Sequence, residues 1–476
     1  MAVGDRSGSA VGGLAGRRPD LLVGPGDAAW DAVRIPFAAT VDQRPVAVAV
    51  PRDPADVAAV LAAARADGLR VAPQRSGHAT ETLDLDGAIL LRTDRMAEVA
   101  VDPVAGTARV GAGALTGDLV AAAARHGLGV LAGSSPTVGV VGFHLGGGLS
   151  FAGRRHGLAA ATITAVELVA PDGRWLRATA AAEPDVLWAA RGRGGGLGVV
   201  TALELRLPRL GPVQAGNLLF PLERAREVGH AWRELTLTAP DGLCLALRAM
   251  RPPPPPGSAA GGGPTGPDGA ALGGRAVAGD LVAVTGLHLG AEDEAAELLA
   301  PLRALGPEID TFAARGPEAL CEIHMDPREP SPAIDDHLLL DDPLPAVAVD
   351  AFVDAVGPGS GSCLALAELR QTGGAMRSPS AGGVSPALPG GHFVFASGLV
   401  GDGPGMAERP HVEADIARVV AALAPWAVGR GFMNFSDRPL PAAAFLPLED
   451  GERLRALSRR WDPEGALVTA HPADPR

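Results

Sequence analysis

The stretch at residues 133–148 constrains the fold more than any other part of the chain. Five of its last ten residues are glycine, and these glycines are interleaved with β-branched and other apolar residues. Because each missing side chain removes a steric clash, such a backbone can lie flat against a large planar ligand. The stretch therefore predicts a protein that is built around a large, flat, bound molecule.

Two further glycine-containing segments point to the same kind of ligand. Residues 73–79 follow directly after a predicted strand, and Gly77 stands there beside small polar residues. This composition lets successive backbone N–H groups turn toward one anion, as in a phosphate-binding nest. His78 lies at the tip of the loop, and residues 191–201 form a third glycine-rich turn that leads into a predicted strand.

A nicotinamide-binding fingerprint is the alternative interpretation of the glycine-containing segments. Gly111 and Gly113 follow a predicted strand and precede a predicted helix, as that motif requires. The third glycine, Gly117, comes one residue too late, and residues 131–133 offer no acidic side chain for a ribose. The sequence therefore argues against this fingerprint.

The order of the motifs resembles that of the FAD-linked oxidases of the PCMH type, specifically the berberine-bridge-enzyme-like group. The resemblance extends from about Leu22 to His471, which is nearly the whole chain. The matching motifs are residues 75–78, 138–148, 154–158, 191–201, 432–437 and 461–467. Several motifs in the correct order are much more specific than any one of them.

The resemblance implies an α+β fold. It consists of a two-part PCMH-type FAD-binding domain and an α/β substrate domain with an antiparallel sheet covered by helices. We expect residues 29–212 to form the FAD-binding domain, residues 213–430 the substrate domain, and residues 431–476 a C-terminal segment that returns to the FAD-binding domain. Residues 1–28 predict a flexible arm, and the proline- and glycine-rich residues 252–275 predict a disordered insertion.

The same resemblance makes FAD the expected cofactor and His78 the residue bonded to the flavin 8α carbon. The alternative is that His78 lines the loop without a covalent bond. The residues expected to contact FAD come from the three glycine-containing segments and from the C-terminal motif. They are Pro73, Gln74, Arg75, Ser76, Gly77, His78, Ala79, Gly133, Ser134, Ser135, Thr137, Val138, Gly139, Gly142, Phe143, Gly146, Gly147, Val199, Val200, Asn434 and Phe435.

Departures from the family pattern limit the chemistry of this chain. The second tether of many relatives is a cysteine, and its place is taken here by Ser135, so we expect a single tether. A histidine of some relatives falls at Phe143, which cannot form a hydrogen bond through its side chain. Phe432 and Phe435 stand where relatives have tyrosine, and the chain contains neither tyrosine nor lysine. Neither a phenol base nor a Schiff base is therefore available.

The candidate catalytic residues lie on the strand expected above the flavin and in the C-terminal motif. They are Glu368, Arg370, Gln371 and Asn434. Strand alternation sends Glu368 and Arg370 to one face of the sheet and Gln371 to the other. A solvated Glu368–Arg370 ion pair is the favoured alternative, and Asn434 is explained equally well as a strand cap. His324 has no partner at metal-ligand spacing, so we expect no metal.

These residues predict an oxidase that transfers a hydride from a small organic alcohol, sugar or amine to flavin N5, with O₂ as acceptor. One alternative is a tailoring flavoenzyme of secondary metabolism that performs a dehydrogenation or a cyclisation. Another is a degenerate flavin-binding protein without turnover, since tyrosine and the second tether are missing. The sequence leaves the substrate and the general base open.

Composition narrows the partners and the compartment. The net charge of −13 argues against nucleic acid or an anionic membrane surface as a partner. The three cysteines are widely spaced and support neither a disulfide framework nor a thiolate metal site. Arg17 and Arg18 could begin a twin-arginine export signal, but no apolar segment follows them, so a cytoplasmic enzyme is expected. The oligomeric state stays open.

Overall fold

The structure is a computed structural model that describes residues 16, 18–81, 83–192, 196–252, 279–378, 382–384, 387–438, 440 and 444–473. The insertion expected at residues 252–275 falls outside the described residues except for Pro252. Most of the expected N-terminal arm falls outside them as well.

The first layer is a four-stranded sheet near the N-terminus, with strand order β1-β2-β4-β3. Its strands are β1 (Leu22–Val23), β2 (Ala47–Ala49), β3 (Arg70–Gln74) and β4 (Ala88–Arg92). Strands β2, β4 and β3 run parallel, because helix α3 (Pro54–Ala66) connects β2 to β3. The Asp53 side chain caps this helix by accepting a hydrogen bond from the Asp56 N–H, and Pro54 occupies the first turn, as the sequence predicts.

The second layer is a five-stranded antiparallel sheet with strand order β5-β6-β9-β7-β8. Its strands are β5 (Val99–Asp102), β6 (Thr107–Gly111), β7 (Ile163–Val169), β8 (Trp175–Thr179) and β9 (Val199–Arg206). Strands β7 and β8 form the hairpin that Pro171, Asp172 and Gly173 predict. The short helices of this half are α2 (Trp30–Arg34), α4 (Thr116–Ala124), α5 (Val140–Leu145), α6 (Gly153–His156) and α7 (Pro184–Ala190).

The third layer is an eight-stranded antiparallel sheet, called the roof sheet below. Its main strand order is β13-β10-β12-β11-β16-β17-β15, and β14 pairs with β10. The strands are β10 (Val213–Pro221), β11 (Leu243–Met250), β12 (Leu281–Leu289), β13 (Ile309–Asp310), β14 (Ala313–Arg315), β15 (Ala333–Leu340), β16 (Leu366–Gln371) and β17 (His392–Leu399). The described residues therefore confirm the predicted antiparallel sheet.

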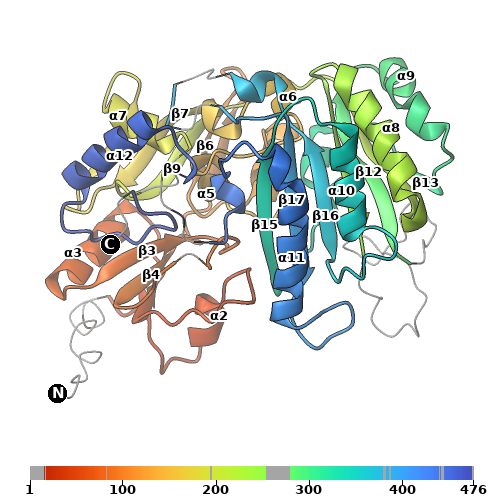
Figure 1. Cartoon of the computed structure of the whole chain (residues 1–476). Coiled ribbons are helices and arrows are strands. Elements are labelled where there is room, and N and C mark those ends of the chain that lie inside the picture. The colour runs from red at the N-terminus through yellow and green to blue at the C-terminus, as the bar shows by residue number, and fades with distance from the viewer. Residues whose placement is uncertain are drawn as a thin grey trace.

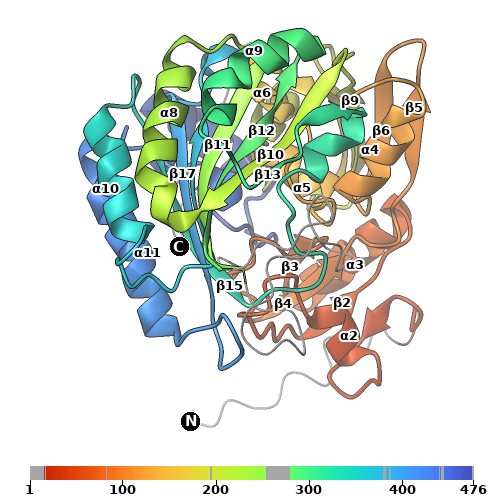
Figure 2. The same ribbon diagram turned by 90° about the vertical axis from the view of Figure 1, so that its right-hand side faces the viewer.

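Helices cover one face of the roof sheet (Figures 1 and 2). They are α8 (Ala225–Thr238), α9 (Glu292–Arg303), α10 (Ala346–Val356) and α11 (Arg409–Leu423). Trp232, Phe352 and Val412 lie fully buried between these helices and the strands. The other face of the sheet is turned toward the first two layers (Figure 2).

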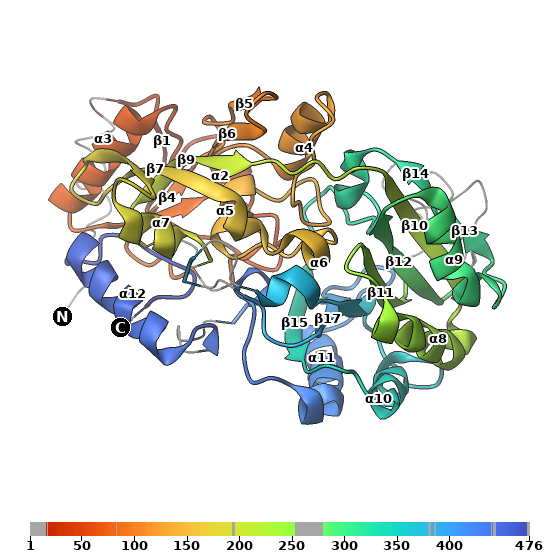
Figure 3. The same cartoon turned by 90° about the horizontal axis from the view of Figure 1, so that it is seen from above.

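The C-terminal segment returns to the first two layers. Helix α12 (Leu448–Trp461) lies beside α7 in Figures 1 and 3, and Arg453 pairs there with Asp185 at 2.6 Å. Leu467 forms a parallel bridge with Val71 of β3. These layers confirm the predicted α+β fold class. Within the described part of the chain, no helix combines the length and apolar character that crossing a bilayer requires.

Candidate functional site

Two of the three predicted ligand-binding segments lie side by side. The Gly139 N–H lies 3.4 Å from Ser76 Oγ, the acceptor of its hydrogen bond. A Cβ atom at Gly139 would come within 2.9 Å of Cγ of Arg75, so glycine is needed for this close approach. Gly77 has a φ of +74°, and a Cβ atom there would lie 2.6 Å from Cβ of Pro36. The loop at residues 73–79 therefore packs closely against Gly139 on one side and Pro36 on the other.

The third segment meets the second around a narrow apolar cavity. The cavity lies between helices α5 and α7 and strands β7 and β9. Its walls are formed by Leu145, Val166, Leu168, Val186, Ala189, Ala190, Leu197, Gly198 and Val200. The three segments, distant in the sequence, thus converge in one half of the molecule.

His78 is held in a defined orientation at the tip of its loop. Its ring stacks on Phe37 with centroids 3.7 Å apart, and its Nε2 lies 3.2 Å from the Thr137 hydroxyl. Thr137 in turn lies 2.9 Å from the Ser135 hydroxyl. Burial lowers the pKa of His78 to about 4, although the Asp326 carboxylate acts in the opposite direction. His78 is therefore neutral at physiological pH, the form in which a ring nitrogen is nucleophilic.

The glycine-rich stretch at residues 138–148 is partly helical. Val140–Leu145 form the helix α5, and Gly146, Gly147 and Gly148 follow it. A Cβ atom at Gly142 would meet no atom within 4 Å, so this side of the helix faces open space. Phe143 is turned the other way and is buried against Gly133 and Gly148. Its side chain therefore packs in the core rather than facing the open side of α5.

Asn434 is hydrogen-bonded to the backbone on both sides of the glycine-rich turn that follows α5. Its Oδ1 accepts a hydrogen bond from the Gly148 N–H at 2.9 Å, and its Nδ2 donates to the Phe143 carbonyl at 3.1 Å. A Cβ atom at Gly146 would lie 2.6 Å from Asn434 Nδ2, and one at Gly147 would lie 2.8 Å from the Phe432 ring. The C-terminal segment thus occupies the space that side chains at these glycines would fill. Both polar ends of Asn434 are used in this contact.

A row of polar and aromatic side chains crosses the face of the roof sheet that lies opposite the helices. Arg248 of β11 pairs in register with Glu368 of β16, which pairs with Phe395 of β17, which pairs with His337 of β15. Arg370 lies in the next row. These side chains leave the sheet opposite the helices, because their strand neighbours Leu247, Leu369 and Val394 fill the helix-covered core.

Gln371 points to the helix-covered side, as strand alternation predicts. Its Nε2 donates to the Thr236 carbonyl of α8 at 3.2 Å. Its side chain is buried there, on the opposite side of the sheet from Glu368. This position removes Gln371 from the group of candidate catalytic residues.

Glu368 is the centre of a buried ion network. Its Oε1 accepts from Arg370 Nε at 2.6 Å, its Oε2 lies 2.6 Å from His324 Nε2, and Arg248 Nε lies 3.5 Å from Oε2. The Glu368 side chain has no solvent exposure, and that of Arg370 has 4%. The favoured explanation of this pair as a solvated ion pair is therefore wrong.

His324 links this network to the glycine-containing segments. It lies in the loop that follows the 3-10 helix η4 (Pro317–Cys321), and its Nδ1 is hydrogen-bonded to the Asp326 carboxylate. Asp326 also accepts a hydrogen bond from the Ser134 hydroxyl at 2.7 Å. The contact between His324 and Glu368 could not be predicted from the sequence, because the two residues are 44 positions apart. The only local signal was the neighbouring acid at position 326.

Both carboxylates of the network stay ionised. Burial by itself would raise the pKa of Glu368, but Arg370, His324 and Arg248 together lower it well below its ordinary value. For Asp326 the burial effect is outweighed by His324 and the Ser134 hydroxyl, and its pKa is also lowered. A carboxylate with a lowered pKa is a weak proton acceptor. Glu368 is thus better suited to orient charge than to act alone as a base.

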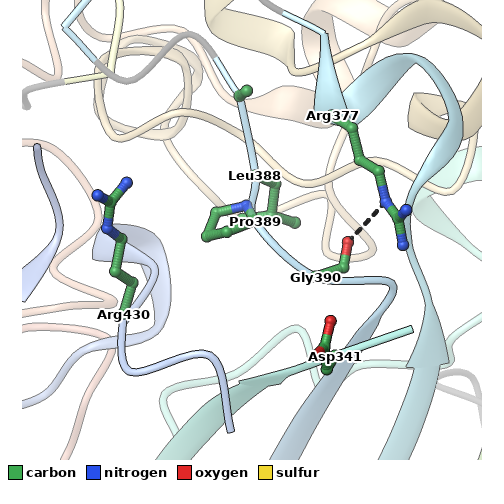
Figure 4. A pocket seen from close by; sticks show the side chains of 7 residues that line it. Asp341, Arg377, Leu388, Pro389, Gly390 and Arg430 are labelled. Atoms are coloured by element: carbon green, nitrogen blue, oxygen red, sulfur yellow. Dashed lines mark hydrogen bonds between the residues drawn. The ribbon is translucent and has the colours of Figure 1, made fainter. Parts of the chain in front are cut away.

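A separate surface cavity of about 340 Å³ lies where strands β15 and β17 meet the C-terminal segment (Figure 4). Its lining residues are Asp341, Arg377, Ala387, Leu388, Pro389, Gly390 and Arg430. Arg377 donates to the Gly390 carbonyl at 3.0 Å and pairs with Asp342 at 2.6 Å. The lining contains no residue of the three glycine-containing segments, so this cavity is distinct from the site that they form.

Comparison with known proteins identifies the cofactor-binding part. A family model described as an FAD binding domain matches residues 45–179. The chain is similar to (R)-6-hydroxynicotine oxidase of Paenarthrobacter nicotinovorans, with 33% identity over 190 residues, which are 40% of this chain and 42% of that protein. It is also similar to xylooligosaccharide oxidase of Thermothelomyces thermophilus, with 29% identity over 211 residues, 43% of this chain and 42% of that protein. The chain thus spans less than half of the length of these relatives.

Solved structures share the fold over nearly the whole chain. The structure of 6-hydroxy-D-nicotine oxidase from Arthrobacter nicotinovorans has a TM-score of 0.78 at 24% identity and covers 96% of this chain and 98% of that one. A chitooligosaccharide oxidase gives a TM-score of 0.80 at 18% identity, with 98% and 100% covered. A berberine bridge enzyme variant gives 0.75 at 19% identity, with 96% and 97% covered. At these identities the likeness establishes the fold.

Proposed function

We propose that this chain, which belongs to the PCMH-type FAD-binding proteins and has the fold of the berberine-bridge-enzyme-like group, is an FAD-dependent oxidase. It would take a hydride from a small organic alcohol, sugar or amine and pass the electrons to O₂. The observation that carries the proposal is the position of His78. A neutral histidine stands at the tip of a glycine-containing loop that packs against the second glycine-rich segment.

The residues present fit a flavin dinucleotide. The loop at residues 73–79 offers backbone N–H groups of the kind that cradle phosphate. Gly142 leaves one side of α5 open to a ligand. Pro73, Thr137 and Val199 lie in these same segments, so we propose the predicted contact residues, apart from the Phe143 side chain, as the cofactor site.

We propose one covalent tether, at His78. The neutral ring can form a bond to carbon without first losing a proton, and stacking on Phe37 fixes its plane. Ser135 lies in the same hydrogen-bonded chain as Thr137, but its hydroxyl is not expected to form the thioether of a second tether. FAD would thus stay with the protein through each cycle.

In the proposed reaction, the flavin supplies the electron chemistry and the protein supplies binding and orientation. Glu368 and Arg370 lie buried on the side of the roof sheet opposite the helices, where the charges of their network would act on the reacting groups without direct contact. Phe393 and Phe395 of β17 stand beside them and exclude water from that part of the face. Phe435 of the C-terminal segment packs against both rings, tilted against Phe393 and edge-on against Phe395.

One observation favours a second candidate, a tailoring flavoenzyme. Phe393, Phe395, Phe432 and Phe435 form an aromatic cluster where a phenol base is absent. An apolar cluster of this kind suits a large hydrophobic substrate whose rings are joined or dehydrogenated. Product analysis under anaerobic conditions separates the two, since a redox-neutral cyclase continues to turn over and an oxidase stops after one cycle.

The test of the proposed function is the fate of the yellow colour. After acid denaturation, the colour should stay with the polypeptide, and His78→Ala should release it. His126→Ala, at an exposed histidine, serves as the matched control and should retain the bound flavin. The protein is then mixed without oxygen with amines, alcohols and sugars in turn, and one of these three classes should bleach the flavin. Admission of air should restore the colour and release H₂O₂. A purified protein that is colourless and takes up no added FAD would refute the proposal.

A further inference from the structure

Asp326 lies in the loop after η4, and the roof sheet holds this loop in a strained conformation. Met325, the residue before it, has a φ of +62°, in the left-handed region that residues other than glycine rarely adopt. The side chains of Asn217 and Arg248 donate to the two backbone carbonyls that precede Met325, both at 3.1 Å. Because such strain persists only where the surroundings enforce it, the position of Asp326 is a built feature of the fold.

Two hydrogen bonds fix the Asp326 carboxylate. His324 Nδ1 is bonded to one of its oxygens, and the Ser134 hydroxyl donates to the other at 2.7 Å. The His324 ring is itself fixed, because its Nε2 lies 2.6 Å from Glu368. These partners outweigh burial and lower the pKa of Asp326, so its carboxylate is ionised. Asp326 therefore presents a fixed negative charge at the start of the second glycine-rich segment.

The same segment carries the residue that His78 contacts. Ser135 follows Ser134 directly, and its hydroxyl lies 2.9 Å from the Thr137 hydroxyl. The Thr137 hydroxyl lies 3.2 Å from His78 Nε2. The carboxylate and the imidazole are thus held at the two ends of one short stretch of chain.

Asp326 is also an acid whose charge acts on His78. Burial lowers the pKa of His78 to about 4, and the Asp326 carboxylate acts in the opposite direction. Asp94 and Glu81 are two other acids beside the His78 loop, but each faces an arginine, at 2.8 Å and 3.5 Å. Asp326 therefore supplies the negative charge that a positively charged His78 would need.

The proposed tether gives His78 such a charge. Bond formation joins the lone pair of a neutral ring nitrogen to the flavin 8α carbon, and a C–H bond of that carbon breaks. The electron pair of this C–H bond passes through the flavin to O₂, and its proton together with one proton from the solvent completes H₂O₂. The other ring nitrogen keeps its proton, so the imidazole becomes a cation. A buried cation is costly unless an anion compensates for it.

We propose that Asp326 is a positioning residue for the tether, and that its carboxylate stabilises the positive charge that His78 acquires as the bond to the flavin 8α carbon forms. This inference rests on the proposed function and adds to it the group that assists attachment of the cofactor. His324 and Glu368 take part by holding Asp326 in place. The loop after η4 thus serves the assembly of the FAD-loaded protein, independently of the substrate that it later oxidises.

The experiment follows tether formation in the full-length chain. Protein from riboflavin-starved cells is mixed in air with FAD at a saturating concentration, and the yellow colour that acid precipitates with the polypeptide is measured over time. Asp326→Asn keeps the shape of the side chain and removes its charge, so we expect the rate at saturating FAD to fall roughly tenfold or more. Non-covalent FAD uptake, measured before acid is added, should stay close to that of the unchanged protein.

Further variants separate the charge from the structure. Asp326→Glu keeps the charge and should form the tether faster than Asp326→Asn. Ser134→Ala leaves the charge but removes one of the hydrogen bonds that hold it, so its rate should fall by a smaller factor. Glu81→Gln is the matched control and should keep the full rate, because Glu81 lies three residues beyond His78 and faces Arg409 instead.

Tether formation by Asp326→Asn at the unchanged rate would overturn the proposal, as would a Glu81→Gln effect of the same size. If Asp326→Asn does not fold, Ser134→Ala decides, and an unchanged rate in that variant would overturn the proposal. The unchanged protein separates this inference from the proposed function. Acid-stable colour that forms equally fast in all variants refutes the role of Asp326 alone. Protein that binds FAD but releases it in acid refutes the tether as well, whereas protein that takes up no FAD refutes the proposed function.

Discussion

Nε2 of His324 lies 2.6 Å from Oε2 of Glu368, and this contact joins the loop after Cys321 to the middle of the roof sheet. The same ring is bonded through Nδ1 to Asp326, which is bonded to Ser134 of the second glycine-rich segment. One imidazole therefore connects the two sides between which the cofactor is proposed to lie. In this network the Glu368 carboxylate faces the guanidinium groups of Arg248 and Arg370, so the buried charges are paired with charges of opposite sign.

Removal of the Glu368 charge should be costly. Glu368→Gln leaves Arg248, Arg370 and His324 buried with fewer anionic partners, so we expect a loss of about 3–5 kcal/mol in the free energy of unfolding. Urea denaturation of the FAD-loaded protein measures this loss. Glu297→Gln, at an exposed position on α9, is the control and should change the stability by less than about 0.5 kcal/mol. A small loss for Glu368→Gln would show that the network contributes little.

Asn434 and Gly146 should behave as a coupled pair. Asn434→Ala removes hydrogen bonds to Gly148 and Phe143 and should cost about 1–3 kcal/mol. Gly146→Ala pushes a Cβ atom into the Asn434 amide and should cost a similar amount. In the double variant the deleted amide leaves room for the new methyl group, so the combined loss should be smaller than the sum. Chemical denaturation of the four proteins gives this coupling, and strict additivity would contradict the contact.

Gly142→Ala should separate folding from cofactor binding. The added methyl group meets no atom within 4 Å, and alanine is favoured over glycine inside a helix by about 1 kcal/mol. The free energy of unfolding of the FAD-free protein should therefore stay the same or rise. FAD uptake should fall, because the methyl group would stand on the open side of α5. Unchanged FAD uptake would place the cofactor elsewhere.

Acid should destabilise the FAD-free protein through its buried histidines. Burial lowers the pKa of His78, His144, His337 and His392 to about 4, below the unfolded-state value of about 6.5. Stability from these groups is complete above about pH 6.5 and is lost as the pH falls toward 4, on the order of 1 kcal/mol or more per histidine. Thermal unfolding at pH 7 and pH 5 measures the loss.

His392→Phe should flatten this pH dependence. Both ring nitrogens of His392 lack hydrogen-bond partners among the described residues, and its ring packs edge-on against Trp232. A phenyl ring keeps that contact and cannot take up a proton. The exposed His126 offers the control variant His126→Phe, whose pH dependence should match that of the unchanged protein. If the loss of thermal stability between pH 7 and pH 5 is the same in all three proteins, His392 does not contribute to the acid destabilisation.

Much of the fold follows from local patterns. The Asp53 cap with Pro54 gives α3, the turn at residues 171–173 gives the β7–β8 hairpin, and alternation places Gln371 away from Glu368. Helix α5 did not follow, because glycine and β-branched residues have weak helix propensity. The burial of Val140 and Phe143 against distant residues overrides that propensity.

The network around Glu368 could not be read from the sequence for a different reason. Strand alternation predicts which face a side chain takes, but it does not say what covers that face. His324 comes from a loop, and its partners lie on β16 and two residues further along the same loop. Such a contact depends on how the loop after η4 folds back over the sheet. The sequence therefore singled out Glu368 and Arg370 as candidates but did not predict that both are buried in an ion network.

The core under the helices of the roof sheet is drawn wholly from residues between Leu218 and Leu423. That half therefore has an apolar core of its own on the helix-covered side of the sheet. Hydrogen bonds cross the boundary between this half and the first two layers. Arg154 donates to the Thr372 carbonyl, Arg155 donates to the Leu289 carbonyl, and the Ser134 hydroxyl donates to the Asp326 carboxylate. Cys244, Ala246 and Leu287 of the roof sheet also pack in the core of the first two layers, so an apolar contact joins the two halves in addition to these hydrogen bonds.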